Sequence, residues 1–234
     1  MKCLILLAVV TAPFAAKADP VLPLFEAANF ASPEPNAYFP MVAGLTSVLT
    51  GTIRDADGSV QPFSLKRTIV GPGPIILGVQ TTSIRDDESE GGLITESSLD
   101  YYASDASGAV WYFGEDVTAF TYDDAGVLTD TKRAPSWTAG VEGARPGIVI
   151  EAAPVLAKVM FRAFAPKAGE TEFSVIEGLG DVVTIYTESS ADPDLRERSQ
   201  YAKGVGLIKT EEDLAADKTN PAVSAALQPE TGQG

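Results

Sequence analysis

The sequence predicts a mostly β, single-domain protein in which one antiparallel meander forms a curved sheet or half-barrel. Three four-residue stretches begin with Asp and end with Gly, namely 55–58, 105–108 and 123–126. In such stretches the Asp side chain accepts backbone hydrogen bonds and Gly adopts a positive φ, so the pattern is typical of hairpin turns. Runs rich in β-branched and aromatic residues flank these turns, as expected for strands of an antiparallel sheet.

The stretch 99–130 is the centre of this meander and is expected to form four short strands joined by three turns. The middle turn is placed at 113–116, because Gly114 suits the first central position of a type II′ turn. Gly-bulge turns put Ala103 opposite Trp111, whereas a longer loop would pair Tyr102 with Trp111. In the first register the face with Trp111 is expected to be the core, and the other face carries Asp100, Tyr102 and Tyr112.

Residues 1–18 resemble a secretory signal peptide. Lys2 supplies the positive region, Cys3–Val10 is an apolar run too short to span a bilayer, and Ala16-Lys17-Ala18 has the form of a cleavage site. Cleavage before Asp19 would also remove Cys3, the single cysteine of the chain. The mature protein is therefore expected to be periplasmic or secreted, with no segment inserted in a membrane.

The mature chain is strongly acidic and lacks histidine and cysteine. Removal of Lys2 and Lys17 lowers the 17 basic residues to 15, against 32 acidic residues. This charge disfavours nucleic acid and anionic membrane surfaces as partners. The missing residue types exclude Ser-His-Asp and Cys-His catalysis and the usual zinc, copper and non-haem iron sites. The chain has no glycine-rich phosphate-binding motif, so no nucleotide cofactor is expected.

Composition divides the rest of the chain into three parts. Residues 19–40 contain five prolines and predict an extended lead-in that lies on the domain. Residues 41–210 hold the predicted strands and form the β domain. Residues 211–234 have little apolar surface to bury and are expected to form a flexible, disordered acidic tail.

Several local motifs resemble a family of uncharacterised exported bacterial proteins. They are Asn36–Pro40, Leu99–Ala103 with Trp-Tyr-Phe-Gly-Glu-Asp at 111–116, Trp137–Ile148, and Tyr-Ala-x-Gly-Val-Gly at 201–206. The match spans most of the mature chain, and the resemblance implies export without implying an activity. The last motif is also similar to the ending of exported proteins with strongly curved antiparallel sheets, some of which hold apolar ligands. Lys203 stands where that ending often has proline.

Carboxylates are the groups in this sequence that could still perform catalysis or bind a metal. Glu115 and Asp116 lie beside aromatic residues, with Asp100 one strand away, and two such acids could serve a glycan hydrolase. Calcium also needs only oxygen ligands, and the acidic loop expected at 86–92 offers Asp86, Asp87, Glu88 and Glu90. A turn role for Asp116 and a solvated, self-repelling acidic loop are the simpler interpretations.

The leading functional hypothesis is an exported binding or envelope-associated module without catalytic activity. Its partner would be a small amphipathic or sugar ligand or an envelope component, held by aromatic and polar side chains at Asp100, Tyr102, Tyr112 and Arg145. The alternatives are a carboxylate-based glycan hydrolase and a calcium-dependent structural or adhesive domain. No cofactor other than calcium is expected. A cavity in which two carboxylates face each other beside Trp111 or Tyr112 would favour the hydrolase.

Overall fold

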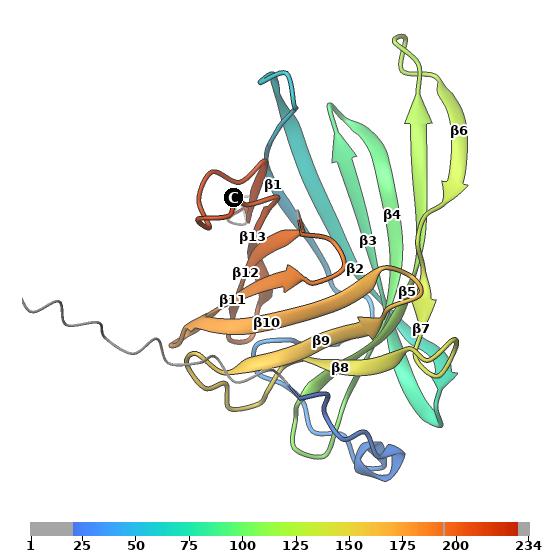
Figure 1. The fold of residues 1–234 in the computed structure, drawn as a ribbon, viewed down its shortest axis with the longest axis vertical. Coiled ribbons are helices and arrows are strands. Elements are labelled where there is room, and N and C mark those ends of the chain that lie inside the picture. The colour runs from blue at the N-terminus through green and yellow to red at the C-terminus, as the bar shows by residue number, and fades with distance from the viewer. Residues whose placement is uncertain (1–20, 194, 229–234) are drawn as a thin grey trace, which may run out of the picture.

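The computed structural model describes residues 21–193 and 195–228, which form one short helix and fourteen strands (Figure 1). The helix is a 3-10 helix, η1 (Ala27–Phe30). The strands are β1 (Thr46–Arg54), β2 (Val60–Ile76), β3 (Val79–Glu90), β4 (Leu93–Ser104), β5 (Val110–Tyr122), β6 (Leu128–Arg133), β7 (Trp137–Thr138), β8 (Arg145–Ile150), β9 (Val159–Ala165), β10 (Glu170–Gly178), β11 (Val182–Ser189), β12 (Arg196–Ala202), β13 (Gly206–Glu212) and β14 (Val223–Leu227). The predicted signal peptide, residues 1–18, lies outside the described residues.

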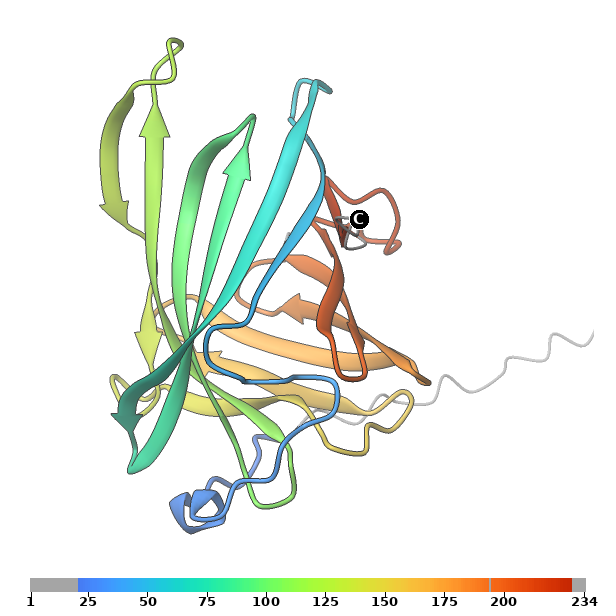
Figure 2. The ribbon, with the colours of Figure 1, turned by 180° about the vertical axis from the view of Figure 1, so that it is seen from behind.

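All fourteen strands belong to one antiparallel sheet that closes on itself. Neighbouring strands follow the order β4-β3-β2-β1-β14-β13-β12-β11-β10-β9-β8-β5, and β4 also pairs with β5, which completes a ring. β6 and β7 pair with β5 beside this ring. In Figures 1 and 2, β2–β5 run along the long axis of the molecule, whereas β8–β10 run across it. The predicted mostly β, curved antiparallel fold is confirmed, and the ring closes further than a half-barrel.

The ring is uneven because the pairing of β5 with β8 is much shorter than the pairing of β5 with β4. β4 and β5 pair from Glu96 and Ala119 to Ser104 and Val110, whereas β5 pairs with β8 at three positions, Val110, Trp111 and Tyr112. β8 thus pairs only with the beginning of β5, whereas β4 pairs along most of the strand. Within the described part of the chain, no helix has the length and apolarity needed to cross a bilayer.

The outer turns of the stretch 99–130 form as expected. The carbonyl of Asp105 accepts the amide of Gly108, and the Asp105 side chain accepts the amides of Ser107 and Ala109. Ala103 lies opposite Trp111, which is the register that Gly-bulge turns predict. The corresponding turn at Asp123–Gly126 is also present.

The predicted middle turn at 113–116 is wrong, because β5 runs straight through these residues. Gly114 has a φ of +131° and lies where the pairing of β5 with β4 shifts by one residue. It also lies opposite Thr138 of β7. A Cβ atom added to Gly114 would lie 2.2 Å from the carbonyl oxygen of Trp137. The glycine therefore permits a bulge and the close approach of β7 instead of a chain reversal.

The two faces of β4 and β5 are both buried, and the candidate ligand-binding face lies inside the ring. Tyr102 and Tyr112 point inward and are 1% and 3% exposed. Trp111 and Phe113 lie on the opposite face, where the lead-in covers them. The Trp111 face is buried as expected, and the face of Tyr102 and Tyr112 is buried as well because a closed ring encloses it.

The lead-in crosses this outer face and fixes itself by aromatic contacts. Phe25 and Phe30 each contact both Trp111 and Phe113, with ring centroids 5.6–6.2 Å apart. Asn36 is buried and donates from its amide to the carbonyl of Gly108. The extended lead-in is thus present in the described residues 21–40, interrupted by the single helical turn η1.

The end of the described chain differs from the expected flexible tail 211–234. β13 continues to Glu212, and β14 pairs with both β13 and β1. Val223 and Ala225 of β14 are 3% and 1% exposed. Strand pairing on both sides supplies the burial that this short segment cannot supply alone, so it closes the ring. Residues 229–234 lie outside the described residues.

Candidate functional site

The interior of the ring contains a polar cavity of about 350 Å³, which we call the acidic cavity. Its walls come from strands on both sides of the ring, including β2–β5, β9, β10, β12 and β13. Two guanidinium groups, Arg67 and Arg162, line it together with nine carboxylates: Asp86, Glu88, Glu96, Asp100, Glu115, Glu170, Glu172, Glu197 and Glu212. Carboxylates are seldom placed inside a protein in such excess without a charge partner.

Two of the carboxylates are neutralised by ion pairs with the two arginines. Arg67 donates from Nε to Asp86 Oδ1 at 2.9 Å and from Nη2 to Asp86 Oδ2 at 2.5 Å. Arg162 donates to Glu172 across the pair of strands β9 and β10. The neighbouring carboxylates raise the pKa of both guanidinium groups in spite of their burial, so both arginines are charged.

Asp100 has one carboxylate oxygen that is buried without a hydrogen-bond partner in the described structure. It is 6% exposed, and Tyr102 donates to its Oδ2 over 3.3 Å. Among the described residues, its Oδ1 atom has no hydrogen-bond partner. Burial and the neighbouring Asp86 raise the pKa of Asp100 to about 7, whereas Arg67, Arg162 and the Ser98 side chain oppose this shift.

Asp100 and Glu115 lie directly opposite each other on β4 and β5. Burial, followed by the charge of Asp100, raises the pKa of Glu115 to about 8. Two carboxylates at neighbouring positions titrate as a pair, and repulsion favours a form that retains a proton between them. This pair is therefore a place where a proton can be stored at neutral pH.

The other free carboxylates are also protonated more easily than usual. Burial raises the pKa of Glu88 to about 9, of Glu212 to about 8 and of Glu170 to about 7. Burial likewise raises the pKa of Glu96 and Glu197. The main charge effect on Glu88 comes from Glu212, so acids on β3 and β13 interact across the interior. When the cavity holds no cation, protons balance much of its negative charge.

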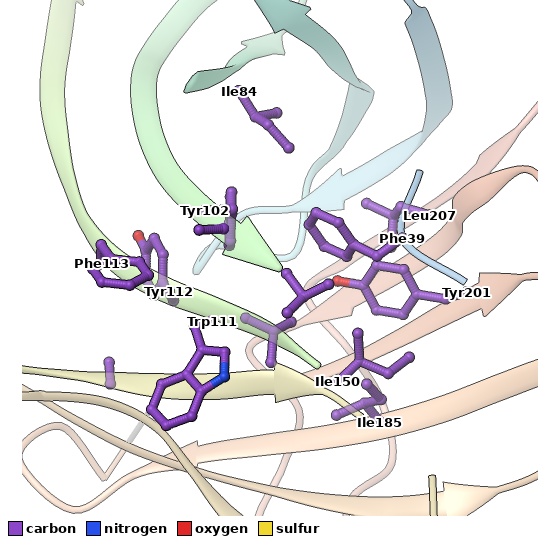
Figure 3. Close-up of a cluster of buried hydrophobic side chains, with 14 of the residues drawn as sticks. Phe39, Ile84, Tyr102, Trp111, Tyr112, Phe113, Ile150, Ile185, Tyr201 and Leu207 are labelled. Atoms are coloured by element: carbon purple, nitrogen blue, oxygen red, sulfur yellow. The ribbon is translucent and has the colours of Figure 1, made fainter. Parts of the chain in front are cut away.

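Aromatic rings form the apolar boundary of the acidic cavity. The rings of Tyr102 and Tyr112 stack, and the guanidinium of Arg162 lies 5.2 Å from the centre of the Tyr112 ring. Figure 3 shows Phe39 between Tyr102 and Tyr201. The Phe39 ring centroid lies 5.1 Å from that of Tyr102 and 5.7 Å from that of Tyr201. These rings exclude water from one side of the carboxylates and so strengthen the effect of their charges.

A second cavity of about 690 Å³ adjoins the first, and we call it the apolar cavity. Apolar side chains make up most of its wall: Phe39, Pro40, Leu45, Val48, Ile69, Ile84, Tyr201, Val205, Leu207 and Leu227. Arg67, Tyr201 and Leu207 line both cavities. The acidic cavity and the apolar cavity are therefore neighbours that share these three side chains.

The structure separates the residues that the sequence singled out for ligand binding. Asp100 and Tyr112 line the acidic cavity. Tyr102 is absent from the cavity wall, but its hydroxyl donates to the Asp100 carboxylate. Arg145 is exposed at the start of β8 and is absent from the cavity wall.

The expected acidic loop is mostly strand, because β3 continues to Glu90 and turns at Gly91–Gly92. Asp86 and Glu88 therefore point into the acidic cavity, whereas Asp87 accepts a hydrogen bond from Ser97 elsewhere and Glu90 accepts one from Thr95. Alternation along the strand separates Asp87 from Asp86 and Glu88, whereas Glu90 is the last residue of β3 and lies outside the cavity wall. Across residues 21–193 and 195–228, no group of three or more His, Cys, Asp or Glu side chains is arranged to hold a metal ion.

Sequence reasoning missed Arg67, Arg162, Glu172, Glu197 and Glu212 as members of one site. A signal for two of them is present in the alternation of the strands. Arg67 occupies the same face of β2 as Leu65 and Ile69, and Glu172 shares a face of β10 with Ser174 and Ile176. A charge at a position that alternation assigns to the interior marks a buried polar site.

Comparison of the chain with protein-family models, with curated proteins and with solved structures gives no significant match.

Proposed function

We propose that the protein is an exported binding protein without catalytic activity, which holds a small amphipathic ligand within its ring of strands. The observation that carries this proposal is the adjacency of the apolar and acidic cavities, which share Arg67, Tyr201 and Leu207. The apolar cavity suits the hydrocarbon part of such a ligand, and the acidic cavity suits its polar part. Their volumes of about 350 and 690 Å³ lie in the range of small-molecule sites, roughly 300–1,000 Å³.

Export to the periplasm or the exterior is part of this proposal. It rests on the signal-like residues 1–18 and on the resemblance to exported bacterial proteins, both of which stay predictions.

Binding of Nile red, an uncharged amphipathic dye, tests the proposal. We expect saturable binding with increased fluorescence, and we expect Val48→Trp to weaken it because Val48 lines the apolar cavity. Val60→Trp is the matched control, since Val48 and Val60 are strand valines that are 41% and 52% exposed, and Val60 is absent from the cavity wall. The proposal fails if the dye does not bind, or if both variants bind it as the unaltered protein does.

A carboxylate-based glycan hydrolase is the second candidate, and the Asp100–Glu115 pair beside Tyr112 favours it. Such an enzyme needs one protonated and one ionised carboxyl group on either side of the glycosidic bond. The small interior cavity suits a small glycoside better than a polymer. Release of nitrophenol from a panel of nitrophenyl glycosides, lost in both Asp100→Asn and Glu115→Gln, would establish hydrolysis and overturn the non-catalytic proposal.

A further inference from the structure

The negative charge of the acidic cavity exceeds what its arginines can neutralise. Arg67 is engaged by Asp86 and Arg162 by Glu172. Glu88, Asp100, Glu115 and Glu212 also line the cavity, and none of them forms an ion pair in the described part of the chain. The unpaired groups come from β3, β4, β5 and β13, so they face the cavity from several directions.

Asp100 adds an independent observation that points to a missing partner. Its side chain is more than nine-tenths buried and lines the cavity, yet Oδ1 meets no donor among the described residues. A buried carboxylate oxygen without a donor costs more free energy than a buried neutral group. A ligand that carries N–H donors and a positive charge would satisfy it.

We propose that the acidic cavity binds the ammonium head of an amphipathic ligand and gives up protons from its carboxyl groups in exchange. This inference rests on the proposed function and specifies its ligand class. The hydrocarbon part would lie in the apolar cavity, past Tyr201 and Leu207. The ammonium group would lie beside Asp100, among the carboxyl groups of the cavity wall.

The exchange is a balanced transfer of charge without covalent change. The amine enters and leaves as the ammonium ion, and each carboxyl group that becomes a carboxylate releases its proton to the solvent. The titratable and charged groups that act on Asp100 come from five strands: Arg67, Asp86, Tyr102, Tyr112, Glu115 and Arg162. Because the pKa of Asp100 is raised to about 7, its proton occupancy changes across neutral pH.

Three probes with the same eight-carbon chain separate head-group chemistry from hydrocarbon burial: octylammonium, octanoate and octyl glucoside. Isothermal titration at pH 7.5 should give octylammonium an affinity at least about tenfold above those of the other two. Its affinity should fall at pH 5.5, since an alkylamine with a pKa near that of lysine, about 10.4, stays charged while the cavity becomes protonated. Titrations in buffers of different ionisation enthalpy should show proton release on binding.

Asp100→Asn and Asp116→Asn form a matched pair of charge deletions on paired strands. Asp100→Asn should weaken octylammonium binding by about tenfold or more and reduce proton release. Asp116→Asn should change neither, because Asp116 is 49% exposed and pairs with Arg133 on the outside. Thermal melting of both variants, compared with the unaltered protein, separates a lost contact from lost folding.

The outcomes distinguish this inference from the proposed function. If octanoate or octyl glucoside binds as tightly as octylammonium, the cationic ligand class is wrong and the binding function stands. Octylammonium binding that is independent of pH and releases no protons also contradicts the exchange. If Nile red and all three probes fail to bind, the proposed function fails together with the inference.

Discussion

The rings of Tyr102 and Tyr112 stack across β4 and β5, with centroids 4.9 Å apart and planes 18° from parallel. Tyr112 also meets Trp137 edge-on and lies beneath Arg162. Tyr112→Ala should therefore lower the free energy of unfolding by about 3–5 kcal/mol, the usual cost of removing a buried aromatic ring. Tyr112→Phe keeps the ring and should cost less than about 1.5 kcal/mol. If urea unfolding shows that the two variants lose equal free energy of unfolding, the ring contacts contribute little to stability.

The interior carboxyl groups predict that stability falls as pH rises. Burial raises the pKa values of five of these groups to between about 7 and about 9 in the folded protein, from 3.8 for Asp and 4.5 for Glu; the five are Glu88, Asp100, Glu115, Glu170 and Glu212. Below about pH 4 both states are protonated at these groups. As pH rises the unfolded chain releases its protons first, so the free energy of unfolding decreases until the native groups also ionise. We expect Tm at pH 8.5 to be lower than at pH 5.5 by at least about 5 °C.

Substitution of one carboxyl group identifies the source of this pH dependence. Glu88→Gln should raise Tm more at pH 8.5 than at pH 5.5, since glutamine keeps the size of the side chain and has no proton to lose. Glu34→Gln is the control, because Glu34 is exposed on the lead-in. If Glu88→Gln changes Tm equally at both pH values, other groups cause the pH dependence.

Gly114 predicts a steric limit on β5. In Gly114→Ala the new Cβ would overlap the Trp137 carbonyl at a backbone φ of +131°. Gly169→Ala provides the comparison, because Gly169 has a φ of +87° with no atom within 4 Å of its added Cβ in the described structure. We expect Gly169→Ala to lower the free energy of unfolding by about 1–2 kcal/mol because of its backbone conformation. Gly114→Ala should lower it by more. Red-shifted tryptophan fluorescence in Gly114→Ala would report the displacement of Trp137, and equal losses would argue against the steric explanation.

Removal of β14 should open the ring. A chain ending at Pro221 loses the partner of both β1 and β13, whereas a chain ending at Gln228 keeps it. We expect the shorter chain to unfold at lower urea concentration and to self-associate in light scattering, because it exposes two unpaired strand edges. The longer chain should match the full protein. Equal stability of the two chains would contradict the role of β14 in ring closure.

Features that depend on neighbours in the sequence were predictable. The Asp105 and Asp123 turns follow from side chains that bond their own backbone, and the Ala103–Trp111 register follows from the turn type. The aromatic contacts of Phe25 and Phe30 follow from apolar residues in an otherwise proline-rich segment. Each of these inferences uses interactions within a short stretch of chain or a simple demand for burial.

Features that depend on ring closure were not predictable from local patterns. Gly114 suits a turn or a bulge equally well, and the approach of Trp137 decides between them. Val223–Leu227 becomes a strand because β1 and β13 supply partners from far along the chain. Asp100, Glu115 and Asp116 were predicted to lie near one another. The meeting of Asp100 and Glu115 with Arg67 and Arg162 requires the curvature of the whole sheet. The chemistry of the interior is thus a property of the closed ring.

The pairing of β1 with β14 also sets the order of events during synthesis. β1 leaves the ribosome before the other strands of the described chain, and its partner β14 leaves after them. Until then β1 has a free edge, and the interior carboxyl groups remain open to water. Contacts so distant in sequence form slowly and leave partly folded chains prone to association. Closure of the ring therefore waits until β14 has been synthesised.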